Sequence, residues 1–350
     1  MLDLTIVRGP LQSHQNEEIL REVNRLTNSH IELKDFCRWV QDSPDGPAFH
    51  ALLNSGQRIV GHFSLIPLRA SLNGEQIPAA RTEYFFVHEE FRREKVRGFE
   101  GSFFPPAILL LDQLYRHCRS SGWGPFLVSA GEEILPFHEL VGCRPMEIAL
   151  HECLFVLRSW QAARRTPNIG QAQRAGLLGI GMAQSSVWTV VASAFARWRS
   201  IKCIPVDQVP VPGEVAGVEL FQDQPSRVWR YPEPDYLVFC CASNPSSYVI
   251  AKNGSEDRYL RVCQWCLGSS DLASSFIHAL LRHAQLSGAL GVRWSVYENG
   301  EKAAELLRTL RNHGFLSAAR VRRLLLYAGD EVFCNSSTWR LSDSLFCFDL

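Results

Sequence analysis

A basic loop is the part of this chain whose residue types and spacing most favour chemistry. It combines four basic side chains, two glycines and a serine: Arg92, Arg93, Lys95, Arg97, Gly98, Gly101 and Ser102. A predicted helix follows, with Pro105 and Pro106 in its first turn, where proline is favoured. Backbone N–H groups at a helix N-terminus bind anions, and glycine lets the backbone approach a phosphate. We therefore expect the loop to bind an anionic group, and an ordinary solvated loop is the alternative.

Glu83 is the second candidate, because it lies in the middle of a predicted strand among apolar neighbours. A carboxylate in such a position is rarely buried unless it is paired or functional. Two interpretations remain open for Glu83. It is either a general base or the partner of Arg81, which lies on the same face of the strand.

Other common catalytic and metal-binding signatures are absent from the sequence. There is no Ser-His-Asp order, no regular metal-ligand spacing, no Walker loop and no dinucleotide fingerprint. The chain has 11 cysteines, of which Cys263 and Cys266 have the spacing of a redox motif. Residues three apart on a strand point to opposite faces, so these two thiols cannot pair. We predict neither a disulfide nor a metal site.

Composition limits the partners and the compartment. Lys and Arg number 36 and Asp and Glu also number 36, so the chain lacks the net positive charge of a typical nucleic-acid-binding protein. The residues after Met1 lack the basic and apolar regions of a signal peptide. Free cysteines are typical of a reducing compartment. We predict a cytoplasmic protein without a nucleic-acid partner.

One order of predicted elements, helix–strand–helix, occurs twice, at residues 106–143 and 271–315. Each predicted helix ends at a glycine, where the backbone must turn left-handed. These glycines are Gly122, Gly142, Gly288 and Gly314. A meander of predicted antiparallel strands precedes each copy. We therefore predict an α/β (α+β) protein with two similar domains, residues 1–158 and 219–350, each a mixed central sheet flanked by helices.

The connector, residues 159–218, contains an uncharged apolar segment at residues 175–196. The segment is long enough to span a bilayer, but its glycine, serine and glutamine residues make its mean hydropathy modest. We predict a buried or interdomain helix and no transmembrane span. The alternative is peripheral membrane contact through residues 175–199, with Trp188 and Trp198 as anchors.

The element order β-α-α-β-β-β-α-β-α-β resembles the GNAT superfamily of acyl-CoA N-acyltransferases, in two tandem copies. The residues that carry the resemblance are Gly61, Pro67, Leu72-Asn73-Gly74, 87–93, 135–143, Trp229-Arg230-Tyr231, Tyr236 and Gly314-Phe315. The second half resembles the C-terminal portion of tandem GNAT-like proteins that are associated with bacterial polysaccharide biosynthesis.

This resemblance implies an N-acyltransferase that uses acetyl-CoA or another acyl-CoA, without a metal, to modify an amine of a small molecule or sugar. It implies CoA contacts at Val87 and the basic loop, a catalytic base at Glu83 and a proton donor at His138. A surface helix histidine is the alternative for His138. Trp229 and Tyr231 would line an acceptor groove or pack against the first half.

Two departures from the family pattern distinguish the halves. After Arg92 the family's glycines are replaced by charged residues, so the phosphate cradle is either shifted to residues 97–102 or lost. The second half has no such loop before its helix, whose predicted cap is Ser270 or Asp271, and Leu310 stands where a proton donor would. We expect an active first half and a degenerate second half. A non-catalytic GNAT-like binding or scaffold protein is the alternative, and a Fem-like aminoacyl transferase is disfavoured by the neutral net charge.

Overall fold

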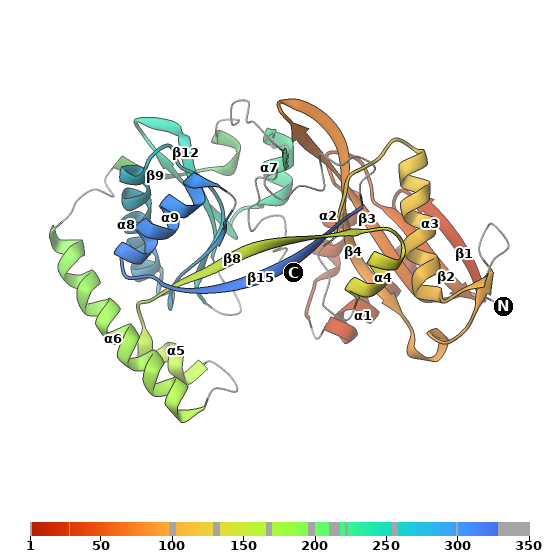
Figure 1. Cartoon of the computed structure of the whole chain (residues 1–350), viewed down its shortest axis with the longest axis horizontal. Helices are drawn as coiled ribbons and strands as arrows, with labels where there is room; N and C mark the ends of the chain where they lie inside the picture. Colours follow the sequence, from red (N-terminus) through yellow and green to blue (C-terminus); the bar gives the residue numbers. More distant parts are fainter. Residues whose placement is uncertain are drawn as a thin grey trace.

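The computed structural model describes residues 2–27, 29–97, 103–128, 134–165, 170–194, 200–209, 218–220, 223–253, 258–298 and 300–327 (Figure 1). These residues form two halves, each a sheet flanked by helices, and a helical hairpin lies between them in the sequence.

The first half contains a strand, two helices and a meander, followed by the first helix–strand–helix unit. Its elements are β1 (Leu2–Arg8), α1 (Ser13–Thr27), α2 (Leu33–Gln41), β2 (Phe49–Ser55), β3 (Arg58–Leu72), β4 (Glu75–Val87), a 3₁₀ turn (Glu89–Phe91), β5 (Val96–Arg97), β6 (Phe103–Phe104), α3 (Pro106–Ser120), β7 (Phe126–Val128), α4 (Leu135–Leu140) and β8 (Arg144–Val156). The apolar positions of α1, among them Ile19 and Val23, recur at helical spacing and are buried. The predicted mixed α/β fold is confirmed.

The hairpin and the second half complete the described chain. Their elements are α5 (Ser159–Arg165), α6 (Gln171–Ala194), β9 (Ile201–Ile204), a 3₁₀ turn (Val206–Gln208), β10 (Val218–Leu220), α7 (Gln224–Arg230), β11 (Tyr236–Cys241), β12 (Asn244–Asn253), β13 (Leu260–Cys266), α8 (Ser270–Ser287), β14 (Gly291–Tyr297), α9 (Glu301–Asn312) and β15 (Leu316–Tyr327). From β11 onward their order repeats that of β2 to β8.

The described strands other than β5 and β6 join one 13-stranded sheet. Its order is β1-β2-β3-β4-β7-β15-β8-β14-β13-β12-β11-β9, and β10 pairs with the end of β3. Two pairs in this sheet are parallel, β4–β7 in the first half and β13–β14 in the second. The two halves are therefore joined edge to edge through β15 and β8.

The two halves exchange their last strands. β8 comes from the first half but lies between β15 and β14, and β15 comes from the second half but lies between β7 and β8. The exchanged strands pair antiparallel, from Leu316 opposite Leu154 to Leu326 opposite Arg144. In Figure 1 they run side by side across the middle of the molecule, in yellow-green and blue. Each half's sheet is thus completed by a strand of the other.

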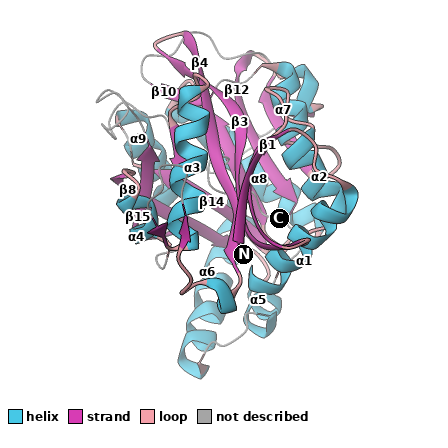
Figure 2. Ribbon diagram, turned by 90° about the vertical axis from the view of Figure 1, so that its right-hand side faces the viewer, coloured by secondary structure: helices cyan, strands magenta, loops and turns pink. Residues whose placement is uncertain are grey.

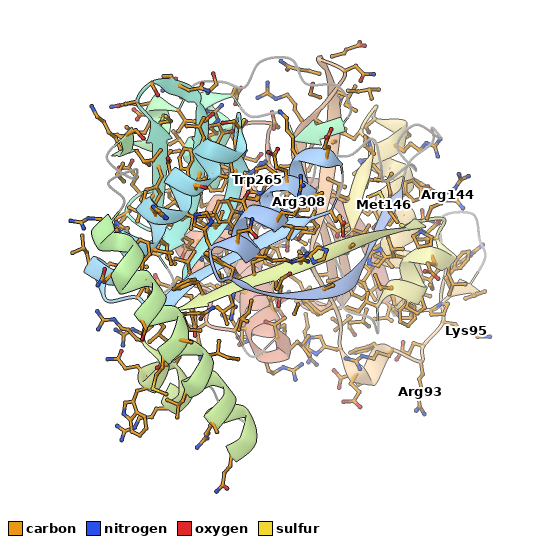
Figure 3. All side chains as sticks on the ribbon, turned by 60° about the vertical axis from the view of Figure 1, so that its left-hand side comes forward. Arg93, Lys95, Arg144, Met146, Trp265 and Arg308 are labelled. Carbon is orange, nitrogen blue, oxygen red and sulfur yellow. The ribbon has the colours of Figure 1, made fainter. Side chains whose placement is uncertain are left out.

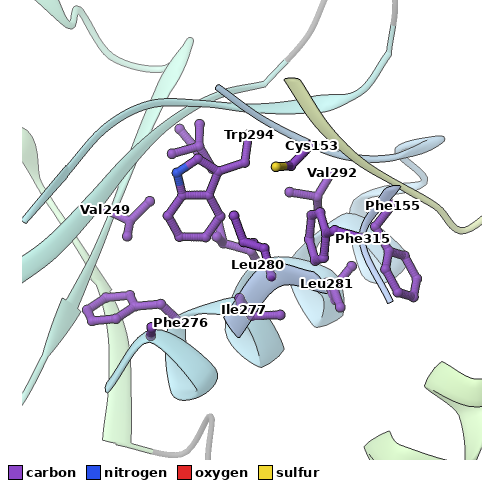
Figure 4. Close-up of a cluster of buried hydrophobic side chains, with 14 of the residues drawn as sticks. Cys153, Phe155, Val249, Phe276, Ile277, Leu280, Leu281, Val292, Trp294 and Phe315 are labelled. Carbon is purple, nitrogen blue, oxygen red and sulfur yellow. The ribbon is translucent and has the colours of Figure 1, made fainter. Parts of the chain in front are cut away.

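Buried apolar side chains cover both faces of the sheet. Phe36 packs in the core beneath α1 and α2, whereas Leu110 packs in the core beneath α3 on the opposite face (Figure 2). A further core lies beneath α8 and α9. Figure 4 shows Cys153 and Phe155 of β8 in that core, beside side chains of α8 and β14. A strand of the first half therefore belongs to the core of the second.

The glycines behave as the sequence predicts. Gly122, Gly142, Gly288 and Gly314 all have positive φ, between 79° and 99°, at helix ends. The nine described cysteines are free. Among the described residues, no group of three or more His, Cys, Asp and Glu side chains could hold a metal ion.

The apolar segment forms helix α6, as predicted, but the helix is not buried all round. Gly181, Gln184 and Trp188 face the body, whereas Ile180 and Met182 are exposed. The prediction of a buried or interdomain helix is therefore wrong for the outer face. Within the described part of the chain, no helix has the length and apolar character needed to cross a membrane.

Candidate active site

The candidate site lies where two parallel strands separate. β4 pairs with β7 only through Ala80 opposite Phe126 and Arg81 opposite Leu127. From there β7 pairs with β15, where Val128 lies opposite Leu325, whereas β4 continues beside β3. Beyond Arg81, this edge of β4 has no strand partner among the described residues.

A β-bulge lies in β4 just beyond this separation. His62 of β3 is opposite Phe86, whereas Ser64 is opposite Glu83, so β4 has one extra residue. Within the bulge, Tyr84 has a φ of 53°, a left-handed conformation that residues other than glycine rarely adopt. Such positions persist only where their surroundings hold them, and they are frequent at functional sites.

His62 holds the peptide that follows Tyr84. The His62 Nδ1 lies 2.7 Å from the Tyr84 carbonyl oxygen, so Nδ1 carries the proton and donates it. The Tyr84–Phe85 peptide is trans, and its N–H therefore points away from its carbonyl. Because the carbonyl points to the His62 side chain, the Phe85 N–H points away from it. A fixed N–H of this kind can stabilise the oxyanion of a tetrahedral intermediate.

A second buried histidine fixes His62. The His62 Nε2 lies 3.0 Å from the Nδ1 of His50. Since His62 donates from Nδ1, its Nε2 must accept when the ring is neutral, and His50 must donate. Burial lowers the pKa of His62 to about 4, and burial with the neighbouring His62 lowers the pKa of His50 well below its ordinary value. Both rings are neutral at pH 7, and the Tyr84 carbonyl sets their tautomers.

Glu83 forms an ion pair with Arg81, two positions earlier on β4. Their neighbours on this face, Ala79 and Tyr84, pack in the core beneath α1 and α2. Burial raises the pKa of Glu83, and the charge of Arg81 opposes that rise. The predicted ion pair is therefore present. It leaves the carboxylate next to the bulge, where a general base would also be needed.

His138 of α4 lies on the opposite face of the sheet and is buried, so the surface interpretation is wrong. Its Nδ1 is 2.9 Å from the Tyr115 hydroxyl of α3. Its ring centroid lies 5.9 Å from that of Phe63 and 6.4 Å from that of Phe85. Burial lowers the pKa of His138 to about 4. The neutral ring can hydrogen-bond to a leaving group, but it is a weak source of protons. The structure brings it beside the bulge without contact with Glu83, which is on the other face.

The basic loop leaves the end of β4 and leads towards α3. Arg92 turns back, and its Nε donates to the carbonyl oxygen of Val87, the last residue of β4, at 3.1 Å. Arg93, Lys95 and Arg97 are exposed, and Figure 3 shows Arg93 and Lys95 extending outward from the molecule. Arg92 therefore shapes the turn, while three neighbouring cations face solvent.

The start of α3 adds backbone donors to these cations. The first hydrogen bond of the helix runs from the Leu109 N–H to the Pro105 carbonyl at 3.0 Å. The N–H groups of Ala107 and Ile108 therefore have no partner within the helix. Gly98, Gly101 and Ser102 lie outside the described residues. Exposed cations beside a helix N-terminus are the donor set that fits a pyrophosphate.

The second half keeps the strand geometry but not the side chains. β13 pairs with β14 only over residues 260–262, and Cys263 is the extra residue of a bulge opposite β12. Leu310, in the place of His138, is fully buried in the apolar core beneath α8 and α9. This half therefore offers no ionisable group at the equivalent position.

No basic loop precedes α8. The Gly268 N–H donates to the Ser247 hydroxyl at 3.1 Å. The N-cap is Ser269 rather than the predicted Ser270 or Asp271, and its side chain makes no capping hydrogen bond. The local hydrogen bonds account for this turn without a ligand.

Trp229 and Tyr231, the predicted acceptor-groove residues, are both buried. The Trp229 Nε1 donates to the Arg38 carbonyl at 3.0 Å, and its ring packs edge-on against Trp39 at 4.5 Å between centroids. The Tyr231 hydroxyl donates to Gln264 Oε1 at 2.7 Å. For Trp229, packing against the first half is therefore present. A role in acceptor binding stays a prediction.

Sequence reasoning missed His50, His62 and Tyr115. The two histidines interrupt apolar strands on either side of the turn at Gly56, and this is the signal that could have revealed them. Tyr115 gives no such signal, because a tyrosine within an apolar helix is an ordinary core residue.

The comparisons with known proteins agree with this geometry. No protein-family model and no curated protein sequence matches the chain. Among solved structures, a probable N-acyltransferase of unknown function from Enterococcus faecalis has a TM-score of 0.58 at 10% identity, covering 93% of this chain and 72% of that chain. A GCN5-related N-acetyltransferase from Kribbella flavida has a TM-score of 0.51 at 15% identity, covering 93% and 71%.

N-myristoyltransferase from Saccharomyces cerevisiae, solved with bound myristoyl-CoA, has a TM-score of 0.54 at 11% identity, covering 93% of this chain and 82% of that chain. At such identities the likeness establishes the fold, and it extends across both halves. This chain therefore has the fold of the GNAT superfamily of N-acyltransferases, in two tandem copies that share one sheet.

Proposed function

We propose that this protein is an acyl-CoA-dependent N-acyltransferase whose first half carries the active site. The acceptor would be an amine of a small molecule or sugar, and the donor acetyl-CoA or another acyl-CoA. The observation that carries the proposal is the hydrogen bond by which His62 fixes the Tyr84–Phe85 peptide in the bulge of β4, just beyond the point where β7 leaves β4. A strained bulge held by a neutral histidine pair is costly unless the peptide it orients has a use.

The proposed reaction forms a C–N bond and breaks the thioester C–S bond. The amine nitrogen attacks the thioester carbonyl, and the Phe85 N–H stabilises the resulting oxyanion. Glu83, in its ionised form, accepts the proton lost by the amine. The CoA thiolate leaves and takes up a proton. His138, neutral at pH 7, would hydrogen-bond to the leaving sulfur rather than protonate it.

The basic loop and the first turn of α3 would hold the CoA phosphates through Arg93, Lys95, Arg97 and backbone N–H groups. The second half would be catalytically silent, since Leu310 cannot donate a proton and no cations precede α8. It would contribute structure through its exchanged strand β15 and through Trp229, which contacts α2.

A non-catalytic binding protein is the second candidate, favoured by the Arg81–Glu83 ion pair, which already satisfies the proposed base. Two measurements on the full chain separate the candidates. Calorimetry with acetyl-CoA and myristoyl-CoA tests binding, and release of the free thiol in the presence of a panel of amines tests turnover.

Replacing Arg93, Lys95 and Arg97 together with alanine should weaken CoA binding by about 1–3 kcal/mol, the range for hydrogen bonds to charged groups. Arg308→Ala, which removes an exposed arginine of α9, is the matched control and should leave binding unchanged. CoA binding without thiol release for any amine would favour the non-catalytic candidate. Absence of CoA binding would refute both the placement of the cofactor and the proposed reaction.

A further inference from the structure

The hairpin of α5 and α6 is fixed to the body along one face of α6. The Gln184 side chain accepts from the Val156 N–H at 2.9 Å and donates to the Gly314 carbonyl at 2.6 Å. One turn further, the Trp188 Nε1 donates to Gln285 Oε1 at 3.3 Å, and Trp188 is buried. Trp188 therefore anchors the helix to the protein and is not available to a membrane, contrary to the alternative that the sequence left open.

The opposite side of α6 is exposed and uncharged, with Ile180 and Met182 on the two flanks of a face made of Gly179, Ala183 and Ser186. Trp160 of α5 is 58% exposed, and Ile180 and Met182 of α6 are 40% and 59% exposed. No charged residue occurs from 175 to 196. The outer face of a helix on a globular protein normally carries charged side chains, so an uncharged outer face indicates that something covers it. In Figures 1 and 2 the hairpin extends away from the sheet, which leaves this face accessible.

Charge identifies the kind of surface that would cover it. Between Glu152 and Asp207 the sequence has no acidic residue and seven basic ones: Arg158, Arg164, Arg165, Arg174, Arg197, Arg199 and Lys202. This excess stands out because the whole chain has 36 basic and 36 acidic residues. Arg164 and Arg174 are exposed on the hairpin itself, and the Arg164 guanidinium lies 4.6 Å from the Trp160 ring centroid.

A second copy of the chain does not fit this face, because two hairpins with the same positive charge would repel each other. We propose that the α5–α6 hairpin docks on the surface of an anionic lipid bilayer. Trp160, Ile180 and Met182 enter the headgroup region, and Arg164 and Arg174 contact the anionic headgroups. Exposed apolar side chains and neighbouring arginines on a non-spanning hairpin are the groups that bind an anionic bilayer surface.

The test is co-sedimentation of the full chain with vesicles of phosphatidylcholine alone or of phosphatidylcholine mixed with phosphatidylglycerol. Binding is expected only with phosphatidylglycerol, and it should weaken as salt is added. The double variant Arg164→Gln/Arg174→Gln should reduce the partition constant about 30-fold, taking about 1 kcal/mol for each basic residue at an anionic surface. Ile180→Glu/Met182→Glu should reduce it at least about tenfold.

Matched controls lie outside the hairpin. Leu26→Glu changes a side chain that is 41% exposed on α1, close to the exposure of Ile180, and Arg308→Gln changes an exposed arginine of α9. Both should bind as the unsubstituted protein does, and circular dichroism should show all variants folded. Failure to bind phosphatidylglycerol vesicles would overturn the proposal. So would binding that the hairpin and control variants reduce equally, or a dimer that Ile180→Glu/Met182→Glu dissociates in the absence of lipid.

Discussion

The buried histidine pair predicts how stability depends on pH. The pKa of His62 is about 4 in the folded chain and 6.5 without burial. The folded pKa is the lower one, so the unfolded chain takes up the proton first as the pH falls. His62 therefore contributes no penalty well above pH 6.5, and stability is lost progressively between pH 6.5 and pH 4. The full loss corresponds to about 3 kcal/mol, of which about 2 kcal/mol appears between pH 7 and pH 5.

His62→Asn should remove this contribution while keeping an N–H near the position of Nδ1. The difference in unfolding free energy between pH 7 and pH 5, measured by urea denaturation, should be about 2 kcal/mol smaller in the variant. His14→Asn, which replaces an exposed histidine of α1, is the control and should keep the original difference. The imidazole resonance that disappears in His62→Asn should titrate near pH 4 in the unsubstituted protein. An equal pH dependence in variant and parent, or a resonance that titrates near pH 6.5, would refute the neutral donor assigned to His62.

Three further predictions test other parts of the structure. Glu83→Gln should lower acyl-CoA turnover by about 10²–10⁴-fold with unchanged folding. The turnover of the unsubstituted protein should fall as the pH drops through the raised pKa of Glu83, because the base must be ionised. Equal turnover in variant and parent would exclude Glu83 as the general base. Trp229→Ala should lower the free energy of unfolding by about 3–5 kcal/mol in urea denaturation, since it empties a buried contact between the halves; a loss below about 1 kcal/mol would contradict that contact. Gly291→Ala should severely destabilise the protein in thermal unfolding, because a Cβ there would lie 1.9 Å from the Phe155 carbonyl oxygen. Gly176→Ala, on exposed α6, has open space around the new Cβ and should stabilise the protein by about 0.5–1 kcal/mol. Similar effects of the two substitutions would contradict the close approach of β14 to β8.

Local patterns predicted the elements well because the chemistry that ends them is local. Gly122 and Gly288 adopt left-handed φ at helix ends, and a meander of antiparallel strands precedes each helix–strand–helix copy, as predicted. The exchange of β8 and β15 was not predictable in this way. Either strand could have paired within its own half. The observed pairing of β8 with β15 depends on contacts between the two halves, which no local pattern specifies.

The parts of the candidate site that depend on local sequence were predictable, and the parts that depend on distant residues were not. Glu83 and Arg81 share a strand face, so their ion pair follows from alternation alone. The burial of His138 depends instead on Tyr115 and Phe63, which come from other elements. Tyr84 has a positive φ and its carbonyl accepts a hydrogen bond from His62 on the neighbouring strand β3, and no local sequence pattern specifies either feature.

The strand exchange also has a consequence for how the nascent chain matures. β8 ends at Val156 and β15 begins at Leu316, 160 positions later, so at about 5–20 residues per second β7 and β8 wait roughly 10–30 s for the strand that lies between them. During that interval their facing edges are unpaired, and unpaired strand edges recruit other chains. We expect ribosome-bound chains that stop before Leu316 to be captured by chaperones or degraded. The residues proposed for catalysis and for CoA binding are all encoded before Cys143, yet their sheet can close only when synthesis has passed β15.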